Sequence, residues 1–572
     1  MRRIPSIIGS LRAAALLLSI LWLPLPFLSF DDHHDGLILA TVTNFQHSLL
    51  NHGDWPFNQY GSFWIFAYGL PTLMVPSHFI FITLRLITVG CYFVTAFLCY
   101  KLMARLISRR MALVCPLLFF ASQPFVASQG SSLVPWPSAI AMPLILGVGL
   151  LVLEKEGISK SNTRLVWAGI LSTCILFTRV QVGLLTIIGI ALLLVVTREW
   201  KKLFAFVVSA AASTLMWLYF LWTRGWLETS LRDQFLFGST YLQTAQHSFH
   251  IPIFTIVGSL LVMATWWVTE KRFITDTISR SKSGFYKATG AISVLIAIAL
   301  IALLVHRKLS LGQFLVAIER RGWICLIIGS VGYFLLRHVN RLLRDRRNGI
   351  AKSSKAFSDS ALIVLSVAAL SQGFPLFDQM HIWWGSVPGI ILVVRLLGER
   401  LDVFEVKKRT MEILVAVGTG LMLIAAIVPW ISQISEPREK FPNFISQVWV
   451  PEAQAQAERE LSSFLFKTIP SGGSVLNLCG NANVFFTDKS RVSASRNFVV
   501  WQAQLDIPVY RAEIVRASPD YIVSCTSQSG LSFATLDTQI ASKIESEVFQ
   551  GKGRLIDSLQ IAEVTWKVSS AD

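Results

Sequence analysis

The sequence carries little charge for its length and lacks the short motifs of nucleotide and metal sites. Only 15% of its 572 residues are charged, whereas soluble domains carry about a quarter, and 53% are hydrophobic. It contains no glycine-rich phosphate-binding loop, no Cys-x-x-Cys pair and no Cys/His metal pattern. The composition therefore indicates a polytopic membrane protein, and nothing in it points to a nucleotide or zinc site.

About thirteen apolar segments are suitable for spanning a membrane as helices. They cover approximately residues 10–30, 78–100, 112–128, 137–153, 165–178, 181–197, 203–222, 251–269, 288–305, 322–337, 360–376, 384–397 and 410–430. Arg2 and Arg3 precede the first segment, Arg12 lies near its start, and no small-x-small cleavage site stands before Asp31. We therefore predict that it is a retained signal anchor.

The basic residues give a formal net charge of +17, and their positions alternate with the predicted spans. With the N-terminus inside, the cytoplasmic loops 101–110, 155–164, 198–202, 271–287, 337–355 and 400–409 are rich in Lys and Arg. The outside loops 31–60, 129–136 and 377–383 contain neither residue. This asymmetry follows the positive-inside rule, and it indicates loops that face anionic lipid rather than nucleic-acid binding.

A shorter apolar stretch, Ser62–Leu70, ends at Pro71 after about nine residues and cannot span a membrane. We predict a helix that lies in the membrane interface, with Trp64 and Tyr68 at the headgroup level. Counting it as a span would invert every later loop and put the basic clusters outside.

A few cations lie outside against this trend. They include Arg179 in the short turn 178–181, and Arg307 and Lys308 between two later spans. An anionic ligand at the outer surface would explain them, and ordinary lipid headgroups or snorkelling side chains are the alternative for any single residue. Arg85 is a weaker candidate because arginines at the ends of spans often snorkel.

The first outside loop concentrates carboxylates and imidazoles directly after the first span, namely Asp31, Asp32, His33, His34 and Asp35. On a helix, Asp35 would share a face with the two preceding carboxylates. Like charges held together favour a carboxylate that takes up a proton, as a general base must. A solvated helix cap is the plainer alternative, and clustered His and Asp can also bind a divalent cation.

The same loop predicts a helix that runs to Leu50, capped by Asp31 or Asp32. Its apolar stripe is Ile38, Val42, Phe45 and Leu49. A second polar site facing outward holds Asp378 and His381 between two late spans. This site either closes over the first loop or is a turn that links helices.

From about residue 432 the hydropathy falls and the pattern changes. Helices are predicted at 451–469, 509–517 and 535–549, with strands at 474–478, 484–486, 521–524 and 561–568. This pattern predicts an α/β domain of about 140 residues, which thirteen spans place outside. Cys479 and Cys525 each end a predicted strand, so either a disulfide or two buried thiols would fit.

Two motifs and the order of the elements carry a resemblance to a known family. His33-His34-Asp35-Gly36 is followed by Asp54-x-Pro56-x-Asn58-Gln59-Tyr60-Gly61. With a retained first helix, an acidic outside loop, an interfacial helix and an outside α/β domain, the chain resembles a bacterial branch of the GT-C glycosyltransferases. The resemblance implies transfer of a sugar from a polyprenyl-phosphate carrier, with a first-loop Asp as the base.

We therefore predict a polytopic α-helical membrane protein of GT-C-like fold in the bacterial plasma membrane. Residues 1–431 form the transmembrane domain, with the first outside loop at 31–77 and interfacial helices in it, and residues 432–572 form the extracytoplasmic α/β domain. The predicted activity is that of an inverting hexosyl- or pentosyltransferase acting on a hydroxyl of a cell-envelope glycan, lipid or protein. A transporter or flippase of a lipid-linked or anionic substrate is the alternative, and a non-catalytic assembly or sensor subunit is a third.

The predicted site follows from these features. The candidate catalytic residues are Asp31, Asp32 and Asp35, any one of which can match the family's base. The candidate substrate-binding residues are His33, His34, Gln59, Tyr60, Arg85, Arg179, Gln181, Arg307, Lys308, Asp378 and His381. No metal ligand or cofactor is assigned, although a divalent cation would be compatible with the first loop.

Overall fold

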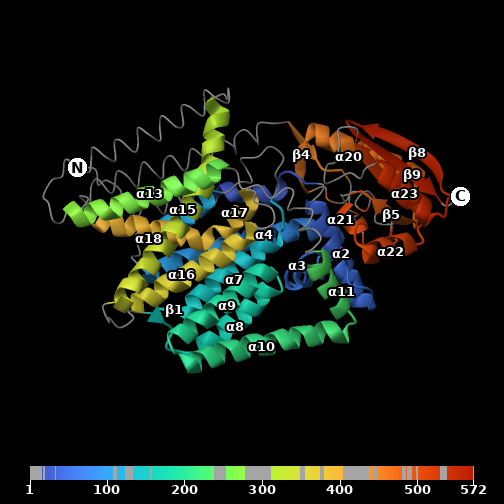
Figure 1. Ribbon diagram of the computed structural model, residues 1–572. Coiled ribbons are helices and arrows are strands. Elements are labelled where there is room, and N and C mark those ends of the chain that lie inside the picture. The colour runs from blue at the N-terminus through green and yellow to red at the C-terminus, as the bar shows by residue number, and fades with distance from the viewer. Residues whose placement is uncertain are drawn as a thin grey trace.

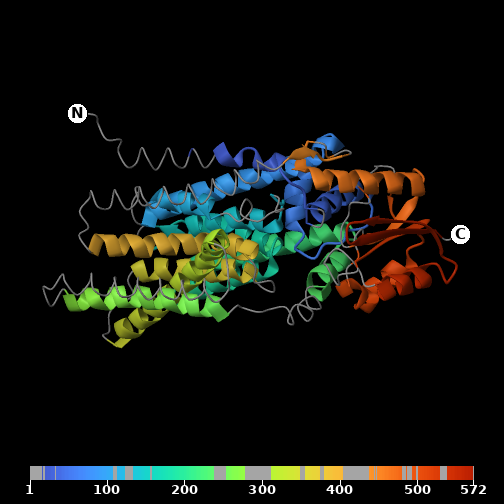
Figure 2. The ribbon, with the colours of Figure 1, turned by 90° about the horizontal axis from the view of Figure 1, so that it is seen from above.

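A computed structural model describes residues 16, 20–31, 34–106, 112–122, 133–154, 157–237, 253–276, 311–347, 354–373, 379–403, 437–442, 445, 447–479, 485, 492–497, 500, 502–527 and 538–570. Long helices lie side by side along one axis, and a region containing strands lies at one end of them, orange to red in Figure 1. The view turned by 90° in Figure 2 gives the same division.

The bundle consists of helices from the first four hundred or so residues. They are α4 (Ser77–Leu106), α6 (Val114–Ala121), α7 (Pro137–Val152), α8 (Asn162–Leu176), α9 (Val180–Val196), α10 (Trp200–Thr223), α13 (Ile253–Asp276), α15 (Leu311–Arg347), α16 (Ser354–Leu370), α17 (Gln379–Gly385) and α18 (Val387–Val403). Within the described residues, three helical stretches are long and apolar enough to cross a membrane, Ser77–Leu106, Trp200–Thr223 and Gly322–Leu343. Shorter apolar helices accompany them, and the predicted spans 288–305 and 410–430 lie outside the described residues, so the count of about thirteen stays a prediction.

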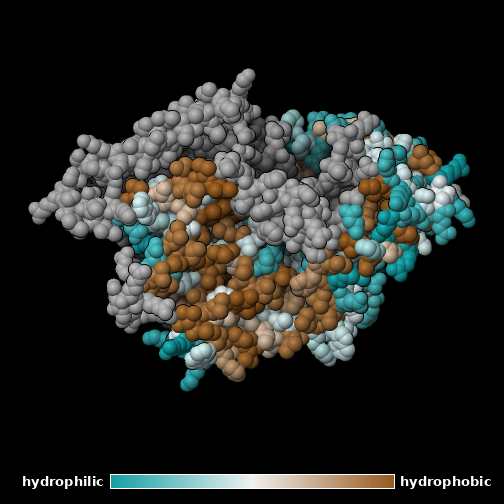
Figure 3. Space-filling model, in the orientation of Figure 1, coloured by the Kyte–Doolittle hydropathy of each residue, from teal (hydrophilic) through white to brown (hydrophobic). Residues whose placement is uncertain are grey.

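The surface of the bundle is apolar over most of its visible length. Figure 3 shows a broad hydrophobic region over the helices and a hydrophilic surface over the strand-containing end. On α10, large apolar side chains are exposed, among them Phe204, Leu215, Met216, Tyr219 and Trp222. An apolar face of this size is what a helix presents to lipid.

Two features of the bundle differ from the sequence prediction. α15 has 37 residues, where the hydropathy predicted a span over 322–337. Its length of about 55 Å exceeds a hydrocarbon core of about 30 Å, and hydropathy marks only its apolar part. In addition, a two-stranded hairpin of β1 (Leu153–Glu154) and β2 (Gly157–Ile158), which was not predicted, connects α7 to α8.

The segment predicted as the first outside loop follows the short helix η1 (Leu25–Phe27) and contains α2 (His34–Asn51). The predicted stripe of α2 is confirmed, because Ile38, Val42 and Phe45 are buried and Leu49 packs against the same core. The helix is held inside the fold by this face.

The second helix of this loop, α3 (Phe63–Thr72), differs from the interfacial helix predicted there. It continues through Pro71 in its last turn, and both Trp64 and Tyr68 are buried. The Tyr68 hydroxyl shares a hydrogen bond of 2.8 Å with Thr88 of α4. The Tyr68 hydroxyl is therefore satisfied inside the protein, and neither aromatic side chain faces lipid headgroups as predicted, whereas the interfacial position of the helix itself stays a prediction.

Beyond residue 437, a five-stranded sheet has the order β6-β5-β7-β9-β8. Its strands are β5 (Ser474–Leu478), β6 (Val492–Ser493), β7 (Tyr521–Ser527), β8 (Arg554–Ile561) and β9 (Val564–Ser570). β5 is parallel to β6 and β7, whereas β9 is antiparallel to β7 and β8. The predicted strand 484–486 falls on residues of which the structure describes only Phe485, and Phe485 is not in a strand.

Helices pack on both faces of this sheet. α20 (Glu452–Thr468) covers one face, where Leu465 packs with Val475 and Val523. α21 (Gln502–Leu505), α22 (Pro508–Arg516) and α23 (Thr538–Val548) cover the other, where Leu476 lies. Successive strand residues point to opposite faces, which produces these two layers. Cys479 and Cys525 are paired as a disulfide, with their Cα atoms 5.4 Å apart.

Candidate active site

The polar cluster begins with Asp31 and His34 at the start of α2. Asp31 Oδ1 accepts a hydrogen bond of 2.8 Å from the backbone N–H of His34, which confirms the predicted helix cap. Asp31 Oδ2 lies 2.9 Å from Nδ1 of the same histidine. The side chains are 26% exposed for Asp31 and 44% exposed for His34. This Asp31–His34 pair is therefore accessible from outside the fold.

The third carboxylate of the loop, Asp35, has a different environment. Its Oδ2 lies 2.7 Å from Nη2 of Arg85, and both side chains are 0% exposed. Arg85 also donates hydrogen bonds of 2.8–3.0 Å to three backbone carbonyls, those of Pro26, Leu28 and Ser29. A guanidinium occupied in this way indicates that Arg85 holds the loop, rather than making the contact with substrate predicted from the sequence.

The residues just before Asp31 also form hydrogen bonds with the C-terminal region of the chain. The Ser29 N–H donates a hydrogen bond of 2.7 Å to the carbonyl of Trp449 in β4 (Trp449–Pro451), which pairs with β3 (Arg438–Lys440). Gln454 of α20 donates a hydrogen bond of 2.9 Å to the carbonyl of Phe30. The position of Asp31 therefore depends on both halves of the chain.

The motif that contains Asn58 and Gly61 forms a turn before α3. The Asn58 amide donates to the carbonyls of Tyr60 (2.8 Å) and Gly61 (3.1 Å), and its Oδ1 accepts from the Tyr60 N–H (3.0 Å). A Cβ at Gly61 would lie 2.1 Å from the carbonyl oxygen of Phe177. Only glycine permits this approach of two backbones, which brings Tyr60 beside the turn that precedes Arg179.

Arg179 is the N-cap of α9 and is 5% exposed. Its guanidinium carbon lies 4.4 Å from the centroid of the Tyr60 ring, and its Nη2 donates a hydrogen bond of 2.9 Å to Ser138. The positive end of the α9 dipole lies at the same place. A buried cation at a helix N-terminus favours an anionic ligand.

Trp136, which the sequence analysis did not single out, lies between these groups. Its ring centroid is 5.1 Å from that of His34, 5.2 Å from Tyr60, 6.5 Å from His381 and 6.1 Å from Trp384. We call these five residues the aromatic cluster. Trp136 stands between two prolines in a predicted outside loop without Lys or Arg, and this was the signal that could have identified it.

The remaining predicted residues divide into two groups. Gln59 donates a hydrogen bond of 3.0 Å to the Tyr60 hydroxyl, and Gln181 is half-buried in the first turn of α9. Five others lie outside the described residues, namely Asp32, His33, Arg307, Lys308 and Asp378. The structure thus brings Asp31, His34, Gln59, Tyr60, Arg179 and His381 around Trp136.

A second buried network was not predicted. Asp233, the first residue of the π-helix η2 (Asp233–Phe237) after α11 (Leu227–Arg232), is fully buried. Both of its carboxylate oxygens accept hydrogen bonds of 2.8 Å from Arg496, and Tyr510 donates a third of 2.9 Å. Burial raises the pKa of Asp233, although the bonds from Arg496 and Tyr510 oppose the shift.

This network connects the C-terminal region to the Asn58 turn, because the Asn58 N–H also donates to Asp233 (3.3 Å). Sequence patterns gave no signal for it, since 263 residues separate Asp233 from Arg496. Its place indicates a role in positioning Tyr60, through the turn that Asn58 organises.

The described residues contain no group of three or more His, Cys, Asp or Glu side chains arranged to hold a metal ion. In the first loop, Asp31 interacts with His34, and Asp35 interacts with Arg85. These pairings do not form a cation site among the residues in view.

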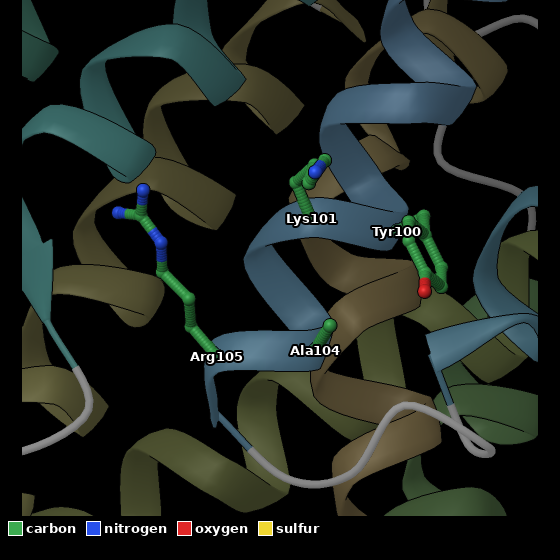
Figure 4. Close-up of a pocket in the computed structure, with 4 residues that line it drawn as sticks. All are labelled: Tyr100, Lys101, Ala104 and Arg105. Atoms are coloured by element: carbon green, nitrogen blue, oxygen red, sulfur yellow. The ribbon is translucent and has the colours of Figure 1, made fainter.

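A separate pocket of about 480 Å³ lies at the C-terminal end of α4, lined by Tyr100, Lys101, Ala104 and Arg105. In Figure 4, the Arg105 side chain extends away from the other three. It donates to the carbonyls of Leu150 and Leu153. About 30 Å of helix separates Arg105 from Arg85, so this pocket does not belong to the cluster around Trp136.

No protein-family model matches the chain, and no curated protein matches it. Among solved structures, the Archaeoglobus fulgidus oligosaccharyltransferase in complex with Zn and sulfate is 14% identical, with a TM-score of 0.48, over 91% of this chain and 68% of that one. ArnT from Cupriavidus metallidurans bound to undecaprenyl phosphate is 12% identical, with a TM-score of 0.45, over 98% and 97%. Both are GT-C glycosyltransferases, the class that the sequence motifs resemble. At these identities and scores the matches assign no activity to this chain.

Proposed function

We propose that the protein is an inverting glycosyltransferase of the bacterial plasma membrane, which moves a sugar from a polyprenyl-phosphate carrier to an acceptor hydroxyl at the outer face. The observation that carries this proposal is the approach of the Asp31–His34 pair and Arg179 to one aromatic cluster. A base and a cation on the same cluster suit a reaction in which a hydroxyl loses a proton and a phosphate departs. The first-loop motifs support the same class.

In the proposed reaction, the Asp31 carboxylate accepts the proton of the acceptor hydroxyl. The acceptor oxygen attacks the anomeric carbon from the side opposite the carrier, so the configuration inverts. The bond between the anomeric carbon and the phosphate oxygen breaks, and the carrier phosphate leaves with the electron pair. Arg179 stabilises this negative charge, and His34 holds the Asp31 carboxylate in place.

The accessible position of Asp31 favours it over Asp35 as the base. A base must reach the proton that it abstracts, and Asp31 is partly exposed whereas Asp35 is fully buried against Arg85. We therefore assign Asp35 and Arg85 to positioning the loop. Asp32 lies outside the described residues and remains a candidate from the sequence.

The distribution of charge supports the proposed orientation. Loops rich in Lys and Arg would be cytoplasmic, and the C-terminal residues 432–572 would lie outside together with the first loop, to which they are bonded through Ser29 and Phe30. In this arrangement the carrier phosphate reaches Arg179 at the outer membrane surface.

The test is a transfer assay with purified protein, a panel of polyprenyl-phosphate sugars and cell-envelope acceptors. We expect wild type to transfer one of these sugars with inversion and Asp31→Asn to lose about 10²- to 10⁴-fold in rate, because the amide keeps the shape and removes the base. Thermal denaturation shows whether the variant is folded. A folded Asp31→Asn protein with the wild-type rate would contradict the assignment, and transport without transfer would favour a flippase.

A further inference from the structure

Gln372 is a buried polar residue that the proposed mechanism does not use. It lies in η3 (Ser371–Gly373), directly after α16, and is 0% exposed. Neither its amide nitrogen nor its amide oxygen has a hydrogen-bond partner among the residues that the structure describes. An amide can donate two hydrogen bonds and accept two. Burying an amide that makes no hydrogen bond costs free energy.

The surroundings of Gln372 relate it to the candidate active site. η3 packs against α9, whose N-cap is Arg179, and against α17, which carries His381 and Trp384. Gln372 therefore lies beside two of the elements that supply the cation and the aromatic cluster.

A second polar atom of this region is also unsatisfied. The indole N–H of Trp136, at the centre of the aromatic cluster, has no acceptor among the described residues, and the side chain is only 4% exposed. By contrast, Trp384 of the same cluster donates its N–H to the Tyr92 hydroxyl (3.1 Å). The unsatisfied groups thus include a donor from Trp136 and an amide that offers both donors and acceptors.

Resting on the proposed function, we propose that Gln372 and the Trp136 N–H bind hydroxyl groups of the sugar that is transferred. Sugar hydroxyls donate and accept hydrogen bonds, as the Gln372 amide does, and carry no charge. The charged phosphate of the carrier suits Arg179 instead. Aromatic side chains provide apolar surface for the sugar's C–H groups. The neutral polar groups thus bind the sugar, and the cation binds the carrier.

A ligand-binding amide and a structural amide respond differently to substitution. Gln372→Leu removes an amide that has no partner in the part of the chain that the structure describes, so the ligand-free protein keeps its stability or gains some. The matched control is Gln46, a buried glutamine whose amide donates to the Gly69 carbonyl (3.1 Å) and to Thr72 (2.8 Å). Gln46→Leu removes both of these buried hydrogen bonds and lowers the denaturation temperature.

The experiment measures thermal denaturation of the full-length protein in detergent, alone, with polyprenyl phosphate, and with each of a panel of polyprenyl-phosphate sugars. We expect wild type to be stabilised more by one of the sugar-bearing carriers than by the bare carrier. In Gln372→Leu and in Gln372→Met, that extra stabilisation is lost and the affinity for the sugar-bearing carrier falls about tenfold, to that of the bare carrier. Trp136→Phe, which keeps an aromatic side chain but removes the indole N–H, loses part of the extra stabilisation.

Several results would overturn the inference. If Gln372→Leu and Gln372→Met destabilise the ligand-free protein as Gln46→Leu does, the amide is structural. If the extra stabilisation by the sugar persists in folded Gln372 variants, the sugar binds elsewhere, while the proposed function stands. If wild type responds to no carrier and transfers no sugar, the proposed function fails and the inference fails with it.

Discussion

Gly61→Ala tests whether the close approach of the Asn58 turn to the turn before Arg179 is needed for the site. The added Cβ would lie 2.1 Å from the carbonyl oxygen and 2.2 Å from the carbonyl carbon of Phe177. These are backbone atoms, and the Phe177 carbonyl also accepts a hydrogen bond of 2.7 Å from the Phe63 N–H. Neither turn can yield by a side-chain rotation.

The expected magnitude follows from this geometry. Reaching an ordinary contact distance of at least 3.4 Å requires the two turns to separate by more than 1 Å. A displacement of about 1 Å at a catalytic group already costs about 10²-fold in rate. The overpacking itself costs about 1–3 kcal/mol of stability. Tyr60 would move away from Arg179, so the rate of transfer should fall even in the fraction of protein that is folded.

The assay is single-turnover transfer at saturating carrier-linked sugar, with thermal denaturation measured on the same preparation. Gly90→Ala is the matched control, because a Cβ at Gly90 of α4 meets nothing within 4 Å. Alanine favours a helix over glycine by about 1 kcal/mol, so this variant should be as active as wild type and no less stable. A Gly61→Ala protein with the wild-type rate and denaturation temperature would refute the reasoning about the two turns.

Three further predictions concern the cation, the disulfide and the topology. Arg179→Ala should slow single-turnover transfer on the order of 10²-fold. Arg179→Lys should be impaired too, because a lysine offers a point charge where arginine offers two donors. Unchanged rates in both variants would show that Arg179 has only a structural role. Cys479→Ser should destabilise the C-terminal region by about 4 kcal/mol, as should Cys525→Ser, since the disulfide closes a loop with a sequence separation of 46; reductant should reproduce the effect on wild type and leave the variants unchanged. Cysteines introduced at Asn51 and Phe466, which are both exposed, should react with a membrane-impermeant maleimide added outside. A cysteine at Lys101 should react only after permeabilisation. Labelling of Phe466→Cys from the cytoplasm alone would contradict the proposed orientation.

Segments with a strong local pattern were predictable from the residues. The stripe of α2, its cap by Asp31 and the strand 474–478 depend on side-chain periodicity and on hydrogen bonds between near neighbours, and all three are present. Hydropathy failed where length and burial are set by neighbours. It marked only residues 322–337 of α15, which extends further at both ends, and it predicted Trp64 and Tyr68 against lipid headgroups, whereas both are buried in the protein.

The candidate site shows the same limit. The residue types in the first loop and at Arg179 already indicated a carboxylate base and an outer cation, because those chemical groups are visible in the sequence. The different roles of the two carboxylates were not visible, since they depend on Arg85, which lies 50 positions from Asp35. Asp35 is fully buried in an ion pair with Arg85, whereas the Asp31 side chain is partly exposed.

Trp136 and the network of Asp233, Arg496 and Tyr510 depend entirely on packing. None of them belongs to a motif, and their partners come from segments far apart in the chain. Periodicity and composition describe the chemistry that a segment carries, whereas distances between segments arise only when apolar surfaces are buried together and buried polar groups find partners. The chemical groups of this protein could therefore be identified from its sequence. Only the tertiary structure places the Asp31–His34 pair, Tyr60 and Arg179 around Trp136.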